Sequence, residues 1–313
     1  MGNLFLIART EFKFRGCVAW ATGLWLLVSI AAAGAQSPAK GPEPAAAAQV
    51  EPDSPTGTPQ SWAEGAVRNE MQVIESAEKV PLRYRQRKVG AKGDTTREVL
   101  VSREGNVARL VEKDGQPITA EEDSDERARL TDEMNSPEDV EKHHRRDAEM
   151  RDSVVKVVGL MPQAMIFSYA PGQPQRKGAG ENEVVLDFHP NPTFHPPTML
   201  AECLTGLEGR VWIDPRSQTL THIEARVLRP VNMGFGILAK IYPGGTLALD
   251  QVNLGGDEWV YSHLDEHLTA RLMLVKNYPE NNVITSWDFH KMPALLSYQD
   301  AIRTLLAMPV ATK

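Results

Sequence analysis

Apolar residues alternate with polar ones along much of the chain, a spacing of two that is typical of half-buried β-strands. Three such runs, residues 82–89, 95–103 and 107–113, are joined by turns too short for parallel crossovers, so they predict an antiparallel meander. Further strand-like runs follow, with Gly, Pro, Asn and Asp in the turns between them: 164–170, 183–188, 207–214, 219–228, 247–254, 259–275 and 283–289. About ten strands, mostly linked by hairpins, predict a large curved sheet or an unclosed, partial β-barrel.

Helical spacing interrupts this pattern near the start, in the middle and at the end of the sequence. Apolar residues from Trp62 to Ala77 keep a helical period, with Ser61 as the expected N-cap and Pro81 closing the segment. An amphipathic helix is expected at residues 298–308. The fold class predicted is therefore α+β, mainly antiparallel β, with N-terminal, inserted and C-terminal helices.

The helical insertion, residues 120–158, is rich in charge and predicts two consecutive helices. Ser136 and Pro137 suit the cap and the first residue of the second helix. Apolar side chains are sparse until Val154, so we expect a solvated arm or lid of which only the end packs on the sheet. The charges are interpreted as a solvated helical face rather than a partner-binding surface.

The first 60 residues differ in character from the rest. Arg9, Lys13 and Arg15 precede an apolar run at 17–33, which ends in an A-x-A site, so residues 1–35 predict a cleaved signal peptide. The alternative is an uncleaved membrane anchor, because the run approaches the length of a spanning helix. Residues 36–60 are rich in Pro and Ala and predict a disordered linker before a domain at 61–313. The expected location is the periplasm or the extracellular space.

Charge and cysteine content narrow the possible partners. Loss of residues 1–35 removes three basic residues and one acidic residue, so the formal charge changes from −7 to −9. An acidic protein is a poor candidate for binding nucleic acid. Cys203 is then the one remaining cysteine, so no internal disulfide is expected and stability must come from a hydrophobic core.

The stretch 262–269, S-H-L-D-E-H-L-T, fits the H-x-x-E-H pattern of zinc peptidases. Those enzymes need the two His one helical turn apart. Here even positions such as Leu264 and Leu268 are apolar and odd ones such as His263, Asp265 and His267 are polar, which predicts a strand with the polar residues facing solvent. No metal site is predicted.

Other motifs give no stronger chemical signal. Residues 234–239 fit G-x-G-x-x-A, but Pro243 and two glycines follow before a crossover helix could form. His189 and His195 lie in a Pro-rich loop without a Cys or acidic partner at ligand spacing. Neither a G-x-S-x-G elbow nor a phosphate loop is found, so no cofactor and no enzymatic activity are predicted.

One predicted hairpin resembles a sequence motif of a known protein superfamily. The run L-E-G-R-V-W-I-D-P at 207–215, followed by T-L-T-H-I-E-A-R at 219–226, resembles the G-x-V-W-[IL]-D hairpin of the bacterial lipoprotein-carrier superfamily, which includes LolA, LolB, the LppX type and RseB. The helix before a meander and the final strand at 283–289 are similar too, whereas the charged insertion exceeds that of the smaller carriers. The resemblance implies an unclosed β-barrel that holds acyl chains, or a related fold used for sensing.

The expected function is therefore the binding of lipid or lipoprotein acyl chains by an exported envelope protein. The alternative is an envelope stress-sensing or assembly factor that binds another protein; a hydrolase is a third possibility, without a visible site. Alternation places seven side chains on the apolar face as candidates to line a ligand cavity: Phe167, Leu186, Val211, Ile223, Leu264, Leu268 and Leu272.

The first prediction concerns export. Protein recovered from the cell envelope should have an intact mass that matches a chain beginning at Gln36, because cleavage is expected after Ala35. A full-length species retained in the membrane would instead support the uncleaved anchor.

Overall fold

The computed structural model describes residues 55–177, 182–233, 239–256, 258–272 and 276–312. The proposed signal peptide, most of the proposed linker and the G-x-G-x-x-A motif except its last residue lie outside the described residues. Among the described residues, no helix combines the length and apolar character needed to cross a bilayer.

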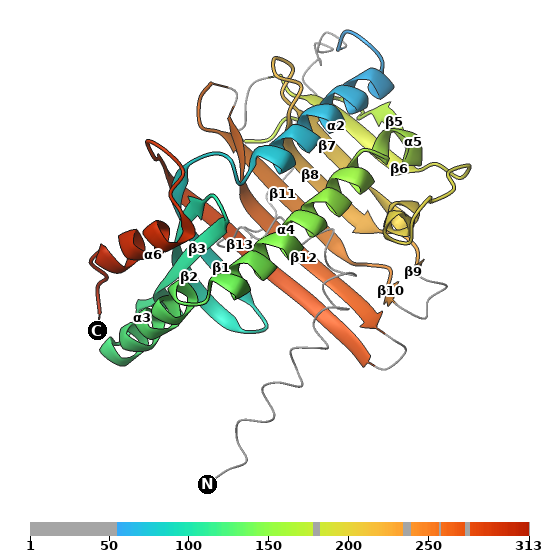
Figure 1. The fold of residues 1–313 in the computed structure, drawn as a ribbon. Helices are drawn as coiled ribbons and strands as arrows, with labels where there is room; N and C mark the ends of the chain where they lie inside the picture. Colours follow the sequence, from blue (N-terminus) through green and yellow to red (C-terminus); the bar gives the residue numbers. More distant parts are fainter. Residues whose placement is uncertain (1–54, 178–181, 234–238, 257, 273–275, 313) are drawn as a thin grey trace, which may run out of the picture.

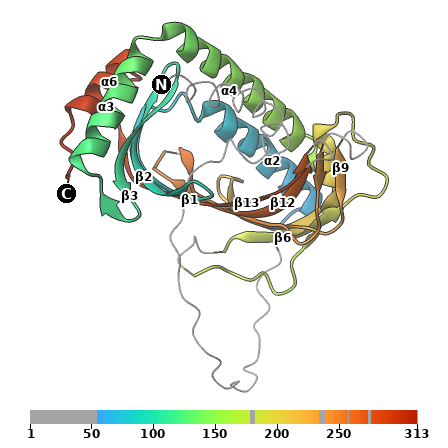
Figure 2. The same ribbon diagram turned by 90° about the horizontal axis from the view of Figure 1, so that it is seen from below.

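A large, antiparallel sheet forms the body of the domain (Figure 1). Its strand order is β4-β3-β2-β1-β13-β12-β11-β8-β7-β6-β5, and β10 joins β12 to β9. β4 and β5 end this order without pairing with each other, so the sheet is curved but not closed into a barrel (Figure 2). The strands are β1 (Leu82–Gly90), β2 (Gly93–Ser102), β3 (Gly105–Lys113), β4 (Gln116–Pro117), β5 (Met165–Tyr169), β6 (Val184–Pro190), β7 (Leu207–Ile213), β8 (Leu220–Val227), β9 (Val231–Met233), β10 (Ala239–Ile241), β11 (Thr246–Asn253), β12 (Trp259–Leu272) and β13 (Lys276–Lys291).

The predicted meander of β1 to β3 and the later strands are confirmed, with two differences. β13 begins seven residues before the predicted strand at 283, because residues 276–282 pair with β12 although they are polar and include Pro279. β1 ends its pairing with β13 at Val283, so Pro279 lies where one side of the strand has no partner and a missing N–H is tolerated. The short strands β4, β9 and β10 were not predicted.

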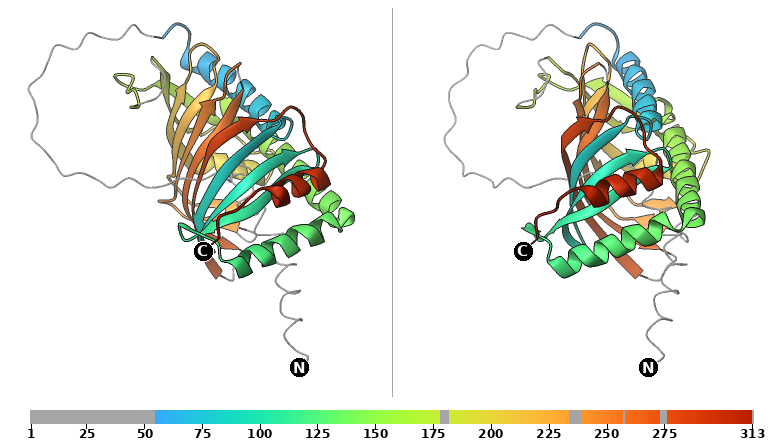
Figure 3. Two further views of the ribbon diagram at one scale, coloured as in Figure 1. Left: turned by 90° about the vertical axis from the view of Figure 1, so that its left-hand side faces the viewer. Right: turned by 60° about the vertical axis from the view of Figure 1, so that its left-hand side comes forward.

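Helices cover both faces of the sheet. α2 (Pro59–Ser76) and α4 (Pro137–Val158) cross the concave face (Figure 2). The short helix α5 (Met161–Ala164) follows α4 and leads into β5, and the 3₁₀ helix η1 (Leu200–Gly206) leads into β7. α3 (Ala120–Met134) and α6 (Tyr298–Ala307) lie together against the β1–β3 end of the sheet (Figure 3). α2 begins three residues before the expected start, because Thr58 rather than Ser61 is its N-cap and the two side chains form the capping box.

The insertion forms the two helices predicted, but the expectation that only its end packs is wrong. Leu130 of α3 is fully buried in a second cluster with Leu100, Ile302 and Leu305. α3 also covers the free edge of β3: Glu126 Oε1 accepts a hydrogen bond from the Leu110 N–H at 2.7 Å. Arg129 Nη2 donates to the Ala108 carbonyl at 2.7 Å. The charged helix therefore satisfies an edge strand that would otherwise be open to another chain.

Arg109 fixes α3 and α6 to the sheet. Its side chain is 1% exposed, and Nη1 donates to the carbonyls of Leu305 and Met308 at 2.5 and 2.9 Å, at the C-terminal end of α6. Nη2 donates to Asp123 of α3 at 2.7 Å. The guanidinium thus replaces intrahelical donors that a helix C-terminus lacks.

We predict that Arg109→Ala lowers the free energy of unfolding by about 3 kcal/mol, because it leaves buried carbonyls and a carboxylate without their donor. Urea unfolding measures this change. Arg127→Ala is the matched control, since Arg127 also binds Asp123 and a carbonyl of α6 but is exposed; its cost should stay below about 1 kcal/mol. Equal costs for the two variants would contradict the assigned role of Arg109.

Candidate ligand-binding cavity

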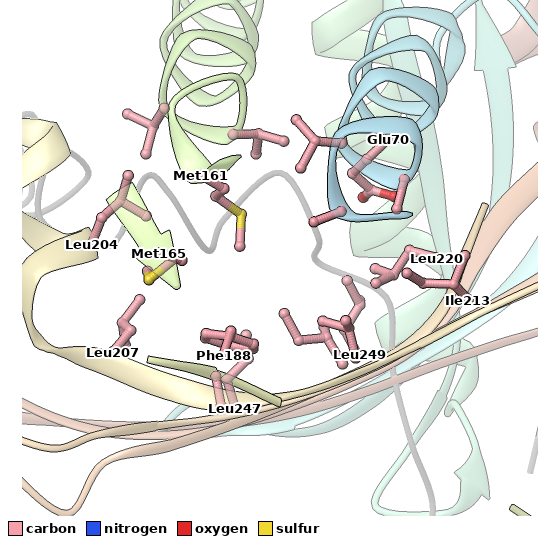
Figure 4. Close-up of a pocket in the computed structure, with 18 of the residues that line it drawn as sticks. Glu70, Met161, Met165, Phe188, Leu204, Leu207, Ile213, Leu220, Leu247 and Leu249 are labelled. Carbon is pink, nitrogen blue, oxygen red and sulfur yellow. The ribbon is translucent and has the colours of Figure 1, made fainter. Parts of the chain in front are cut away.

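A cavity of about 140 Å³ lies between the concave face of the sheet and the helices α2, α4 and α5 (Figure 4). Among the described residues that line it, Glu70 and Tyr261 alone bring side-chain oxygen or nitrogen, and the others are apolar. The helices contribute Ala63, Ala66, Val67, Glu70 and Ile74 of α2, Val154, Val157 and Val158 of α4, Met161 of α5 and Leu204 of η1. The sheet contributes Met165, Phe167, Phe188, Leu207, Val211, Ile213, Leu220, Ile223, Ala225, Leu247, Leu249, Tyr261 and Leu264.

The sequence of α2 explains how it roofs the cavity. Ala63, Ala66, Val67, Glu70 and Ile74 recur at helical spacing and face the sheet as one stripe. The small residues let the helix approach closely. Gly65 lies where an added Cβ would stand 2.4 Å from the Gln218 side chain, in the turn between β7 and β8.

Asn69 fastens α2 to the same turn. Its Nδ2 donates to the carbonyls of Ser217 and Gln218 at 2.6 and 3.1 Å. These hydrogen bonds from the Asn69 side chain to backbone carbonyls hold α2 at the edge of the cavity, and they involve no residue of the cavity lining.

Two β-bulges decide which side chains of the floor face the cavity. The β7–β8 pairing shifts between Trp212 and Ile213, so Leu220 and Ile223 both face the cavity while the buried His222 lies beside Trp212. The β11–β12 pairing shifts between Asp250 and Gln251. Each bulge inserts one residue and reverses the alternation beyond it.

The second bulge changes the predicted orientation of the start of β12. Strict alternation put Val260 and Ser262 on the face of Leu264, but Tyr261 lines the cavity instead. The aromatic ring is buried and extends the apolar floor, while its hydroxyl supplies a hydrogen bond to Glu70.

Glu70 brings a carboxyl group into the apolar lining of the cavity. Tyr261 Oη donates to its Oε1 and Gln251 Nε2 to its Oε2, both at 2.6 Å. Burial raises the pKa of the Glu70 carboxyl above its usual value, and the two hydrogen bonds oppose this rise. Burial, with the adjacent Glu70, also raises the Tyr261 pKa well above 10, so the phenol remains a donor.

Of the seven side chains predicted to line a cavity, some line it and others do not. Phe167, Val211, Ile223 and Leu264 line it. Leu186 and Leu268 are buried in the surrounding hydrophobic core but are not part of the lining. Leu272 ends β12, and its side chain lies outside the described residues.

The H-x-x-E-H stretch lies in β12, so the strand prediction is confirmed. His263 and His267 are therefore four residues apart along a strand, not one turn apart on a helix. His267 Nε2 lies 2.8 Å from Asp265 Oδ1, and Nδ1 lies 3.0 Å from the amide oxygen of Asn281. Glu266 of the motif is 4% exposed and faces the opposite way, beside Leu247 on the concave side.

Sequence reasoning missed Glu70, Gln251 and the methionines of the roof and wall, Met161 and Met165. One signal was available for Glu70. It lies four residues from both Ala66 and Ile74, within the apolar stripe of the predicted helix, where a carboxylate is out of place.

A second carboxyl, Glu266, is buried in the sheet next to a residue of the cavity lining. It pairs across the sheet with the lining residue Leu247, and Asn282 Nδ2 donates to its Oε2 at 3.2 Å. Burial raises the pKa of Glu266 to about 7; the Asn282 hydrogen bond opposes this, the charge of Glu280 adds to it, and Lys88 and His267 oppose it.

We predict that Glu266→Gln reduces the pH dependence of stability between 4.5 and 7. Because the folded-state pKa lies above the usual glutamate value of 4.5, wild-type protein is stabilised by this group below pH 4.5 and loses that stability as the pH rises through about 7. The loss is on the order of 3 kcal/mol. Urea unfolding across this pH range should show that the free energy of unfolding of the variant, relative to that of the wild type, increases by this amount. Glu141→Gln is the control, because Glu141 is exposed on α4. If the difference in unfolding free energy between Glu266→Gln and wild type did not change with pH, the raised pKa of Glu266 would be contradicted.

Comparison of the chain with models of protein families, with curated proteins and with solved structures finds no match. The resemblance to the lipoprotein-carrier superfamily therefore stays an expectation that rests on the hairpin motif at 207–226.

Proposed function

We propose that this protein is an exported envelope protein that binds the acyl chains of a lipid or lipoprotein in the cavity under α2 and α4. The observation that carries the proposal is the lining, in which apolar side chains from helices and sheet surround a partly open cavity. Apolar cavities of this kind stay free of water and admit apolar ligands. The basic and apolar N-terminal segment of the sequence supports export.

The volume of the cavity limits how much of an acyl chain fits before the helices must move. A dry cavity of about 150 Å³ admits benzene, so the 140 Å³ found here accommodates a short apolar segment. A complete acyl chain requires α2 and α4 to move away from the sheet. Each buried methylene contributes about 0.8 kcal/mol, so a long chain supplies several kcal/mol toward that movement.

The polar groups of the cavity support binding rather than catalysis. An active site needs a nucleophile or base, its orienting partner and a group that stabilises developing charge around one reacting atom. Here the two polar lining residues, Glu70 and Tyr261, are hydrogen-bonded to each other. The buried His222 is also committed, with Nδ1 2.8 Å from Asp250 and Nε2 3.2 Å from Glu224.

The test is uptake of an apolar probe together with identification of retained lipid. Protein purified without detergent should increase the fluorescence of Nile red and release lipid on denaturation, detected by mass spectrometry. Ala66→Leu adds three carbons to the cavity lining and should weaken Nile red binding at least tenfold, without lowering the melting temperature by more than a few degrees.

Ala128→Leu is the matched control, because Ala128 is exposed on α3, away from the cavity. It should bind Nile red as wild type does. Wild-type protein that takes up neither Nile red nor lipid would refute the proposal and leave the protein-binding alternative.

A further inference from the structure

Contacts other than those of Glu70 also hold α2 in place. Asn69 already fastens the helix to the turn between β7 and β8 through two carbonyls. Leu or Met at position 70 would continue the apolar stripe of Ala66 and Ile74 and would remove the cost of burying a carboxyl. A carboxyl kept at this position therefore calls for an explanation other than the packing of α2.

The carboxyl has no counterion. No ion pair joins Glu70 to a basic residue of the described chain, and the two groups that donate to it, the Tyr261 hydroxyl and the Gln251 amide, are neutral. Figure 4 shows Glu70 projecting from α2 among apolar side chains of the cavity. The same burial that excludes water raises the Glu70 pKa, so its negative charge would be stabilised by a cation brought by a ligand.

Gln251 adds a free acceptor beside Glu70. Its side chain is 5% exposed, Nε2 donates to Glu70, and Oε1 is buried with no hydrogen-bond partner among the described residues. A buried carbonyl oxygen without a donor is costly, and a ligand that supplies one removes the cost. Both Glu70 and Gln251 thus offer acceptors, and the Tyr261 hydroxyl and one N–H of the Gln251 amide already donate to Glu70.

We propose that Glu70, which lines the cavity, and Gln251, which hydrogen-bonds to it from outside the lining, form a polar end that selects amphiphiles whose head group donates hydrogen bonds, a primary ammonium above all, over those with a carboxylate head. This proposal rests on the function proposed above. An ammonium pairs with the Glu70 carboxylate and has further N–H groups for Gln251 Oε1, and a neutral hydroxyl can satisfy one acceptor. A carboxylate head group meets a like charge at the ionised Glu70, and the Tyr261 hydroxyl is already donated to Glu70.

The experiment compares three ligands with the same eight-carbon chain: octylamine, octanol and octanoate. Each competes with Nile red for the full-length protein at neutral pH, where the amine is cationic and the acid anionic. We expect octylamine to bind tightest and octanoate at least tenfold more weakly than octylamine. Glu70→Gln should reduce the ratio of amine to acid affinity at least tenfold, because it removes the charge but keeps the size of the side chain.

Gln251→Leu is the second variant. It removes the Oε1 acceptor and should weaken octanol binding severalfold while the preference of octylamine over octanoate persists through Glu70. Glu75→Gln is the control, because Glu75 is exposed on the same helix, and it should leave all three affinities unchanged.

The outcomes separate the two proposals. If Nile red binds but octanoate competes as well as octylamine, or if Glu70→Gln leaves their ratio unchanged, head-group selection is wrong and the apolar cavity stands. If neither Nile red nor any eight-carbon ligand binds, the proposed function fails, and the inference about Glu70 fails with it.

Discussion

The concave face of one unclosed sheet is the constraint on which the rest of the structure depends. Strands β5 to β8, β11 and β12 present apolar side chains to one side, and a curved sheet that is not closed cannot bury that side by itself. α2 and the end of α4 cover it, with Val154 and Val157 buried in the same core. A space remains between these helices and the curved floor of the sheet, and this space is the cavity.

Buried charge is handled in two different ways in this protein. At the β1–β3 end, Arg109 is matched by two carbonyls and Asp123, and Glu126 by Arg97, Arg129 and the Leu110 N–H, so these charges connect helices to the sheet. In the cavity, Glu70 is matched by neutral donors alone among the described residues. The first arrangement is complete without a ligand. The second leaves Gln251 Oε1 unpaired, and this incompleteness is the basis of the proposed head-group selection.

The hairpin that carries the family resemblance serves both faces of the sheet. Val211 and Ile213 line the cavity, while Trp212 between them packs against the His222 ring at a centroid distance of 4.9 Å and donates to the Pro174 carbonyl. Gly209 is required by close approach, since an added Cβ would stand 2.0 Å from the Glu224 carbonyl oxygen. The motif thus has a structural explanation within this chain, independent of any relationship.

The sequence by itself determined the elements, because the period of the apolar residues and the caps and turns are local properties. The meander, the two helices of the insertion and the strand that carries His263 and His267 follow from it. It could not determine the bulges in the β7–β8 and β11–β12 pairings, which depend on the partner strand and which turn Tyr261 rather than Ser262 into the cavity. Nor could it place Glu70 against Gln251 and Tyr261, about 180 and 190 residues away. Burial of a polar group is decided by what packs over it, so the tertiary structure alone joined these residues into one site.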